Sequence, residues 1–199
     1  MFTGIVKEIG QVRHFSRYQK SENLMVRSKI ISASANVGDS VSVNWVCLTV
    51  TKIKKPDELV FDLLNETMEL TDLGLLKPGD RVNLEDSLKA SDKISGHFVT
   101  GHIDCLGIVK KKGIVNNNHA IEITIPKKFM KLLAPKGSVA IDGVSLTVVS
   151  VFGDSFNVYI IPHTMNNTIL GEKGVSKKVN IEFDVLAKYA LNLKNPTVL

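Results

Sequence analysis

Cysteine is scarce in this sequence of 199 residues, in which Cys47 and Cys105 are the two cysteines. Neither stands in a CxxC motif or at a metal-ligand spacing from the five histidines. We therefore expect neither a disulfide framework nor a structural zinc site.

Long apolar runs are also missing. One of the longest, residues 139–151, is interrupted by polar residues and glycine: Asp142, Gly143, Ser145, Thr147 and Ser150. A transmembrane helix needs about 20 consecutive apolar residues, so we expect no membrane span. Residues 1–8 hold no basic region followed by an apolar run, which predicts a cytoplasmic protein.

Aromatic residues make up 6% of the chain, and its net charge is +5. The lysines that carry much of this charge stand in short separate groups, at residues 54–55, 110–112, 127–128 and 177–178. Nothing indicates the aromatic-studded basic face of a nucleic-acid-binding barrel, so we expect no nucleic acid partner. With 44% hydrophobic and 23% charged residues, the composition is that of an ordinary globular protein.

The sequence does contain a repeat. Residues 3–6 (TGIV) return 97 positions later as residues 100–103 (TGHI), and residues 82–85 (VNLE) return as residues 179–182 (VNIE). Residues 41–50 reappear as residues 139–148, at an offset of 98. A repeat this long predicts two similar domains rather than a solenoid. We place them at residues 1–97 and 98–184, followed by a tail at 185–199.

Short segments rich in Val, Ile, Thr and Phe alternate with turn residues in both halves, which predicts strands. The clearest are residues 24–28, 59–64, 81–84, 120–125, 156–161 and 179–183. Short helical turns are expected at 32–35, 71–75 and 127–133, and a terminal helix with one apolar stripe at 185–193. About six short strands in each half favour an all-β fold of two small closed barrels.

The repeated segment at 41–50 and 139–148 loses its alternation in the middle. The apolar residues change parity after Asn44-Trp45 and again after Asp142-Gly143, which requires a bulge or a sharp bend. The bend leaves one set of polar side chains on the face away from the core, namely Cys47, Thr49, Ser145 and Thr147. These side chains are candidates for ligand contacts, and the alternative is an outer strand face with a buried free cysteine.

Residues 95–104 join the two halves and contain His97 and His102 beside glycines. An imidazole pKa near about 6.5 makes either histidine a usable acid or base, although each could instead be a hydrogen-bonded structural residue. Lys136 stands just before the second repeated segment, as a surface charge or as a donor to a polyhydroxyl chain or a carbonyl. The halves differ where chemistry is expected, since Cys47 corresponds to Ser145 and Ile5 to His102. Two like domains with unlike polar groups suit two like ligands in different roles.

Several segments together resemble the riboflavin synthase family across essentially the whole chain except the tail. They are residues 1–6 (MFTGIV), 47–51 (CLTVT), 73–74 (LG), 77–83 (KPGDRVN), 95–104 and 141–148. The resemblance implies two Greek-key six-stranded β-barrels and a C-terminal helix that joins three chains into a homotrimer. It also implies that two molecules of 6,7-dimethyl-8-ribityllumazine exchange a four-carbon unit, without metal or cofactor, giving riboflavin and 5-amino-6-(D-ribitylamino)uracil. Association with a lumazine synthase shell is left open.

The resemblance further implies which residues bind the two substrates, at a site where the first barrel of one subunit meets the second barrel of its neighbour. One substrate is expected against Cys47, Leu48, Thr49, Asp62, Leu63, Leu64, Asn65, Glu66, Thr67, Gly101, His102, Ile103 and Lys136. The other is expected against Gly4, Ile5, Val6, Ser145, Leu146, Thr147, Tyr159, Ile160, Ile161, Pro162, His163 and Thr164.

Four residues are predicted to be catalytic: Cys47, His97, His102 and Ser145. We assign proton transfer to His102 and Ser145, and the transient nucleophile to Cys47 or water. Thr49 and Thr147 are expected to orient the rings. The rival hypothesis of the same fold is a non-catalytic lumazine or flavin antenna protein, which would keep its ligand contacts in one half only. Both halves here keep their Leu-Thr-Val strands.

Trp45 departs from the family pattern, which has glycine there, as the second half does at Gly143. If the bend needs a positive φ, a tryptophan in this place is strained. We expect its indole to lie over the first ligand site or in a subunit contact.

Overall fold

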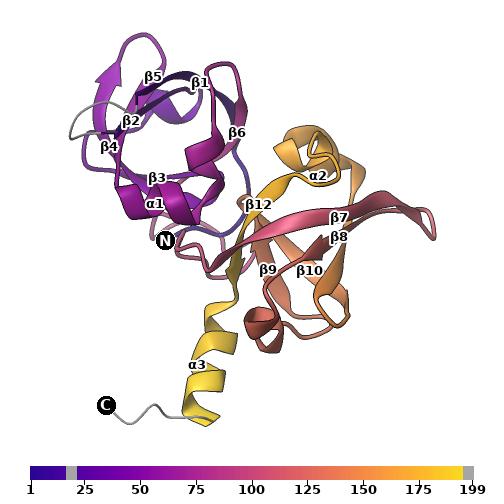
Figure 1. Ribbon diagram of the computed structural model, residues 1–199. Coiled ribbons are helices and arrows are strands. Elements are labelled where there is room, and N and C mark those ends of the chain that lie inside the picture. The colour runs from indigo at the N-terminus through magenta and orange to yellow at the C-terminus, as the bar shows by residue number, and fades with distance from the viewer. Residues whose placement is uncertain (17–21, 195–199) are drawn as a thin grey trace.

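The computed structural model describes residues 1–16 and 22–194. Within these residues the chain forms two closed antiparallel β-barrels of six strands each, followed by a C-terminal helix (Figure 1). The predicted all-β fold with an internal duplication is confirmed.

The first barrel has the strand order β1-β2-β5-β4-β3-β6, a Greek-key arrangement that closes when β6 pairs with β1. Its strands are β1 (Glu8–Ser16), β2 (Glu22–Arg27), β3 (Ser40–Val43), β4 (Val46–Lys54), β5 (Glu58–Leu63) and β6 (Arg81–Asp86). Its helical turns are η1 (Ile31–Ala33), α1 (Asn65–Leu70) and η2 (Asp72–Leu75).

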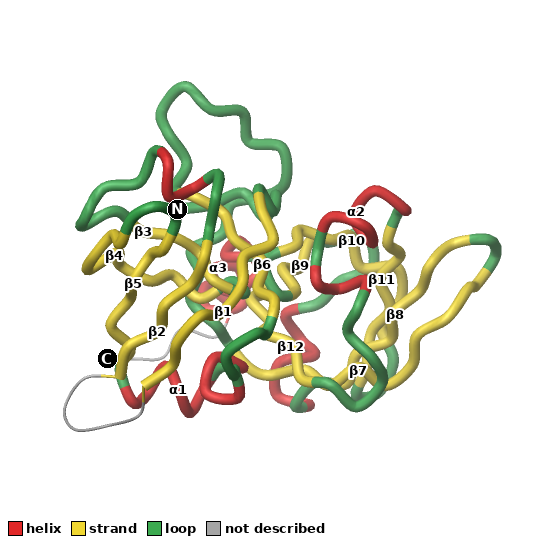
Figure 2. The backbone as a smooth tube through the Cα atoms, turned by 90° about the horizontal axis from the view of Figure 1, so that it is seen from above, coloured by secondary structure: helices red, strands yellow, loops and turns green. Residues whose placement is uncertain are grey.

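The second barrel repeats this topology in the order β10-β11-β8-β7-β12-β9. Its strands are β7 (Cys105–Val115), β8 (Asn118–Thr124), β9 (Ser138–Ile141), β10 (Val144–Val151), β11 (Ser155–Ile160) and β12 (Lys178–Phe183). Its helical segments are η3 (Lys127–Leu132), α2 (Pro162–Asn167) and η4 (Ile169–Gly171), and α3 (Val185–Lys194) follows. The tip of the β7–β8 hairpin extends beyond its barrel (Figure 2).

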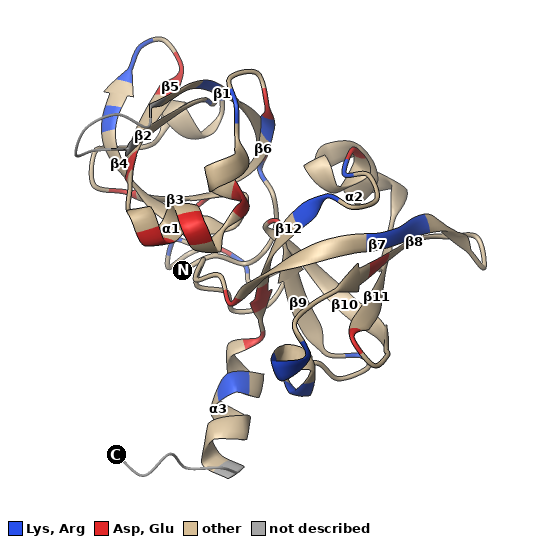
Figure 3. Cartoon of the chain, viewed as in Figure 1, with Lys and Arg blue, Asp and Glu red and all other residues tan. Residues whose placement is uncertain are grey.

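Period-2 alternation explains why each barrel closes around its own core. In β4, Val46, Leu48 and Val50 are buried, while Cys47 is half-buried and Thr49 is exposed. Burial of one face of every strand provides the main drive for closure. The lysines and arginines, by contrast, lie on separate elements of both barrels (Figure 3).

The bend expected within each repeated segment is a two-residue hairpin turn. Asn44 and Trp45 connect β3 to β4 with φ values of 45° and 80°, and Asp142 and Gly143 connect β9 to β10 with 45° and 87°. Positive φ at both central positions is the type I′ geometry that fits the twist of antiparallel strands. A bulge and a two-residue turn produce the same parity change in sequence, which is why the two could not be separated.

The expectation for the Trp45 indole is wrong. The indole is fully buried between the two barrels of one chain, in a cluster with Phe2, Val99 and Ala140. Phe2 and Val99 are paired by an isolated β-bridge, Ala140 lies on β9, and Trp45 stands in the β3–β4 turn. Burial among these residues removes the apolar surface of the indole from water, which is favourable.

The expected helical turns are present at η1, η2 and η3, and the terminal helix is α3. The sequence analysis missed α1 and α2, two six-residue helices that contain several of the predicted substrate contacts. Both lack a buried residue and a capping side chain, which are two of the usual signals. A third was available for α2, which begins with Pro162. In the described part of the chain, no helix is long and apolar enough to span a bilayer.

Candidate active site

Each barrel sends one short segment across to the strand of the other barrel that bears the candidate residues. We call residues 3–6 the first crossing segment and residues 100–103 the second crossing segment. The backbone N–H of Ser145 donates to the Gly4 carbonyl at 2.8 Å, and that of Cys47 donates to the Gly101 carbonyl at 3.0 Å. Candidate residues far apart in sequence are thereby brought together in two similar sites.

Glycine is required in both crossing segments. Gly4 has a φ of 79°, and a Cβ on it would lie 2.5 Å from the Ser145 Cβ. Gly101 has a φ of 81°, and a Cβ on it would lie 2.6 Å from the Cys47 Cβ. Only a residue without a side chain allows this left-handed backbone and this close approach.

Two buried carboxylates hold the crossing segments, and the sequence analysis did not select them as site residues. Glu85 accepts from the N–H and hydroxyl of Thr3, at 2.8 and 3.0 Å, and from the Gly4 N–H at 3.1 Å. Burial raises the pKa of Glu85, while the Thr3 hydrogen bonds oppose that rise. A glutamate at the same place of a repeated strand, in VNLE and again in VNIE, was the available signal.

Glu182 is the counterpart of Glu85 in the second barrel. One of its oxygens accepts from the Thr100 N–H and hydroxyl at 2.8 and 2.7 Å. The other accepts from the backbone N–H groups of Gly101 at 2.8 Å and His102 at 3.1 Å. The second crossing segment is therefore bound along its backbone by one side chain.

His97 lies against Ser145, with 2.7 Å between His97 Nδ1 and Ser145 Oγ. Burial lowers the pKa of the His97 imidazole from its ordinary value of 6.5, against the opposing pull of Asp184 and Glu182. The neutral imidazole is thus favoured, and its Nε2 is buried with no hydrogen-bond partner among the described residues. The assignment of proton transfer to Ser145 and His102 stays a prediction. The side chain that contacts Ser145 is His97, while His102 is exposed and follows Gly101, the residue that contacts Cys47.

We call the surroundings of Cys47, including the second crossing segment, the first-barrel site. Predicted residues 62–67 continue it, because β5 pairs with β4 and the Thr51 hydroxyl donates to Asp62 Oδ1 at 3.5 Å. Asp62 and residues 64–66 are exposed.

We call the surroundings of Ser145, including the first crossing segment and His97, the second-barrel site. Predicted residues 159–164 belong to its barrel, on β11 and α2. Ile161, Pro162 and His163 are exposed, and Thr164 is half-buried.

Four of the predicted contact residues point into the barrel cores: Leu48, Leu63, Leu146 and Ile160. Their side chains fill the hydrophobic interior, so a bound ring could meet only their backbone.

Lys136 was grouped with Cys47, but within one chain it lies on the other barrel. Lys136 stands just before β9, and its backbone N–H donates to the Val148 carbonyl of β10 at 2.8 Å. A single chain therefore does not bring Lys136 to the first-barrel site.

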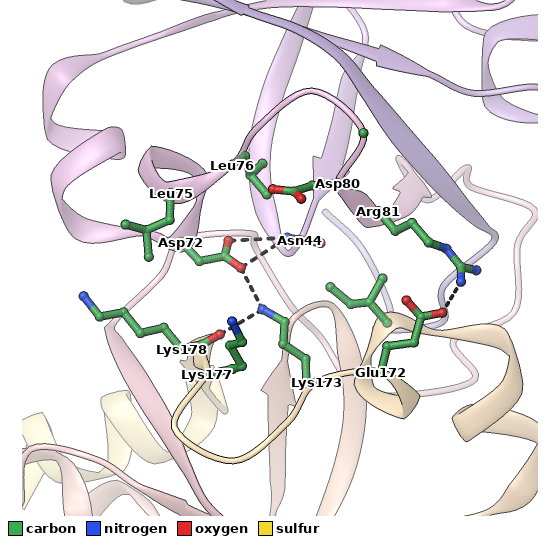
Figure 4. Close-up of a pocket in the computed structure, with 12 residues that line it drawn as sticks. Asn44, Asp72, Leu75, Leu76, Asp80, Arg81, Glu172, Lys173, Lys177 and Lys178 are labelled. Atoms are coloured by element: carbon green, nitrogen blue, oxygen red, sulfur yellow. Dashed lines mark hydrogen bonds and ion pairs between the residues drawn. The ribbon is translucent and has the colours of Figure 1, made fainter.

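A cleft of about 510 Å³ between the barrels contains none of the predicted site residues (Figure 4). Lys173 crosses it, with Nζ 3.0 Å from Asp72 of the first barrel and 3.1 Å from Asp142 of the second. Burial raises the pKa of Asp142 to about 7, with Lys173 opposing the rise. This arrangement joins the barrels.

Among the described residues, no group of three or more His, Cys, Asp and Glu is placed to hold a metal ion.

The known proteins that resemble this chain point to one family. Residues 3–87 and 100–184 each match the lumazine binding domain. The chain is 38% identical to the riboflavin synthase of Actinobacillus pleuropneumoniae, over 95% of this chain and 87% of that protein. It is 37% identical to the riboflavin synthase of Mycobacterium tuberculosis, over 97% and 98%.

Solved structures agree in fold. LumP complexed with 6,7-dimethyl-8-(1'-D-ribityl) lumazine has a TM-score of 0.82 and 25% identity, covering 92% of this chain and 99% of LumP. The riboflavin complex of LumP has a TM-score of 0.84 over the same shares. With two lumazine binding domains and this similarity along nearly its whole length, the chain belongs to the riboflavin synthase family.

Proposed function

We propose that this chain catalyses the conversion of two 6,7-dimethyl-8-ribityllumazine molecules into riboflavin and 5-amino-6-(D-ribitylamino)uracil. The observation that carries the proposal is the pair of equivalent sites, each made by a crossing segment against a hairpin strand of the other barrel. Their frames are alike, but one presents a thiol and the other a hydroxyl paired with an imidazole. A reaction between two identical molecules in unlike roles needs such a difference.

The ligand class is supported by the named relatives. The curated relatives compared above are riboflavin synthases, and LumP is complexed with a ribityl lumazine and with riboflavin in solved structures. A glycine carbonyl at each site and the exposed residues around it offer acceptors and donors suited to a polar ring with a polyhydroxyl chain.

Proton removal is assigned to Ser145 and His97 in the second-barrel site. The 7-methyl group of one lumazine must lose a proton to become a carbon nucleophile. Ser145 Oγ takes that proton while its own passes to Nδ1 of His97, which burial keeps neutral and able to accept it. We assign His102, which follows Gly101 in the second crossing segment, to the other substrate.

The first-barrel site holds the acceptor lumazine, where the Cys47 thiol or a water adds to the ring. Thr49 and Thr147 are exposed at equivalent places of β4 and β10, and we assign them to orienting the rings. Binding both rings in fixed positions replaces a bimolecular encounter by a local one, which can supply several kcal/mol, up to about 11.

A trimer would complete the site. Leu186, Tyr189 and Leu193 of α3 are 68%, 67% and 83% exposed and fall on one face at helical spacing. We propose that this face joins three chains, and that Lys136 of one subunit reaches the first-barrel site of the next.

Mixing the purified protein with 6,7-dimethyl-8-ribityllumazine and following flavin absorbance tests the proposal. We expect turnover, and a loss of about a hundredfold in kcat for Ser145→Ala. Phe152→Ser changes an exposed loop residue of the same barrel and serves as the control, with unchanged kcat. Ligand binding without turnover would select an antenna protein instead, and no binding at all would reject both.

A further inference from the structure

Trp45 is the only tryptophan of the chain and stands at the second position of the β3–β4 turn. Its φ of 80° lies in the left-handed region that favours glycine, and Gly143 occupies the equivalent position with a φ of 87°. A bulky side chain in this backbone conformation is costly unless its surroundings compensate. The indole must therefore make contacts that the glycine of the other half does not make.

The indole makes two such contacts inside the inter-barrel cluster. It packs edge-on against Phe2, with ring centroids 6.0 Å apart. Its Nε1 donates to Glu182 Oε2 at 2.6 Å. Since this hydrogen bond joins a buried donor to a carboxylate, it belongs to the stronger class.

The same oxygen of Glu182 accepts from the backbone of the second crossing segment. Gly101 N–H lies 2.8 Å and His102 N–H lies 3.1 Å from Oε2. Gly101 in turn contacts Cys47, and both Cys47 and Ile103 pack against the cluster that contains the indole. The indole thus holds the Glu182 carboxylate by one hydrogen bond, and the carboxylate holds the second crossing segment next to Cys47.

We propose that Trp45 is a positioning residue of the first-barrel site, acting through Glu182 to hold the second crossing segment in place for the ligand at Cys47. This inference rests on the proposed function. Fixing donors and acceptors before binding reduces the ordering cost on association.

The second half of the chain has no counterpart to this device. Gly143 has no side-chain donor, and among the described residues Glu85 accepts from Thr3 and Gly4. The carboxylate of the first-barrel site is thus held by a side-chain donor that has no equivalent at Gly143.

Hydrogen exchange in Trp45→Phe tests the proposal, because phenylalanine keeps an aromatic ring but removes the N–H donor. We expect the amides of residues 100–102 to exchange about tenfold faster, with those of Thr3 and Gly4 unchanged. In a riboflavin titration, the weakening should be confined to one of two binding steps, by about fivefold or more. Phe2→Leu is the matched control, since it loosens the same cluster without removing a donor from Glu182.

A role in packing alone would make Trp45→Phe and Phe2→Leu behave alike, with both crossing segments affected, and would overturn the proposal. In the unaltered protein, the single indole N–H should exchange as slowly as the amides of residues 100–102. Faster exchange of the indole would equally overturn it. If the unaltered protein failed to bind riboflavin, the proposed function would fail as well, whereas normal binding by Trp45→Phe would reject only the role of Trp45.

Discussion

Ser145 and His97 are joined by their side chains at the junction of the barrels, and His97 Nε2 is buried without a partner in the described residues. A buried polar atom without a hydrogen-bond partner lowers the stability of the fold. Such groups are common at functional sites, where they have a chemical task. The pairing gives the second-barrel site a hydroxyl in direct contact with a buried imidazole.

The activity of this pair should depend on pH in a defined direction. Burial lowers the pKa of His97 below 6.5, so the imidazole is neutral at pH 7 and is lost as a base only when pH falls through its lowered pKa. We expect kcat/KM to fall on the acid side with a midpoint below 6.5. The measurement is a pH profile from pH 4.5 to 8, in which His97→Gln should remove this limb and lower kcat by about a hundredfold. An acid limb that is unchanged in His97→Gln would exclude the assignment.

Single site residues could be predicted from the sequence, but the contacts between them could not. Cys47 and Ser145 could be selected because the repeat aligns them and alternation puts both on the outer face. His97 was a candidate because it lies in the connecting segment, but its contact with Ser145, 48 positions away, depends on the fold. Glu85 and Glu182 were visible as a matched pair, but their task depends on a crossing that local pattern does not encode.

At the scale of elements, the crossing segments depend on glycine for two separable reasons, a left-handed backbone and a close approach. Gly101 combines both, while Gly38 has a φ of 96° with nothing within 4 Å of an added Cβ. The chain thus offers a comparison that separates strain from contact.

Gly101→Ala should lower stability by about 1 to 3 kcal/mol and weaken one riboflavin binding step by about tenfold, because its Cβ meets that of Cys47. Gly4→Ala should weaken the other step, because its Cβ meets that of Ser145. Gly38→Ala should carry only the backbone cost and leave both steps unchanged. Urea unfolding and riboflavin titration measure these effects. Equal weakening of both steps by each variant would show that the two sites are not separate.

The strands and the two barrels could be predicted from period-2 alternation and the repeat, because burial of one strand face makes apolar residues alternate with polar ones in the sequence. The short helices α1 and α2 could not, because each has six residues, none of them fully buried, and no capping side chain. The residues within them came from the family resemblance.

At the scale of the whole molecule, the barrels are joined by symmetric and asymmetric contacts. Asn83 Nδ2 donates to the Asp142 carbonyl at 2.7 Å, and Asn180 Nδ2 donates to the Asn44 carbonyl at 2.6 Å, as the repeat requires. Lys173 breaks the symmetry by bridging Asp72 and Asp142. Removing one member of a buried ionic cluster leaves the others without compensation.

Lys173→Met should therefore lower the free energy of unfolding by about 3 to 5 kcal/mol at pH 8. Without the lysine, the pKa of Asp142 rises further above its value of about 7, so the folded chain holds a proton that the unfolded chain, with a pKa near 3.8, has released. Stability of the unaltered protein also rises as pH falls below about 7, but that of the variant rises more because its Asp142 pKa is higher, so the deficit should shrink at pH 5. Urea unfolding at the two pH values measures it. Lys177→Met, in the same cleft but outside both ion pairs, should change stability by less than about 0.5 kcal/mol. A deficit that is the same at pH 5 and pH 8 would show that Lys173 stabilises the interface by packing rather than by charge.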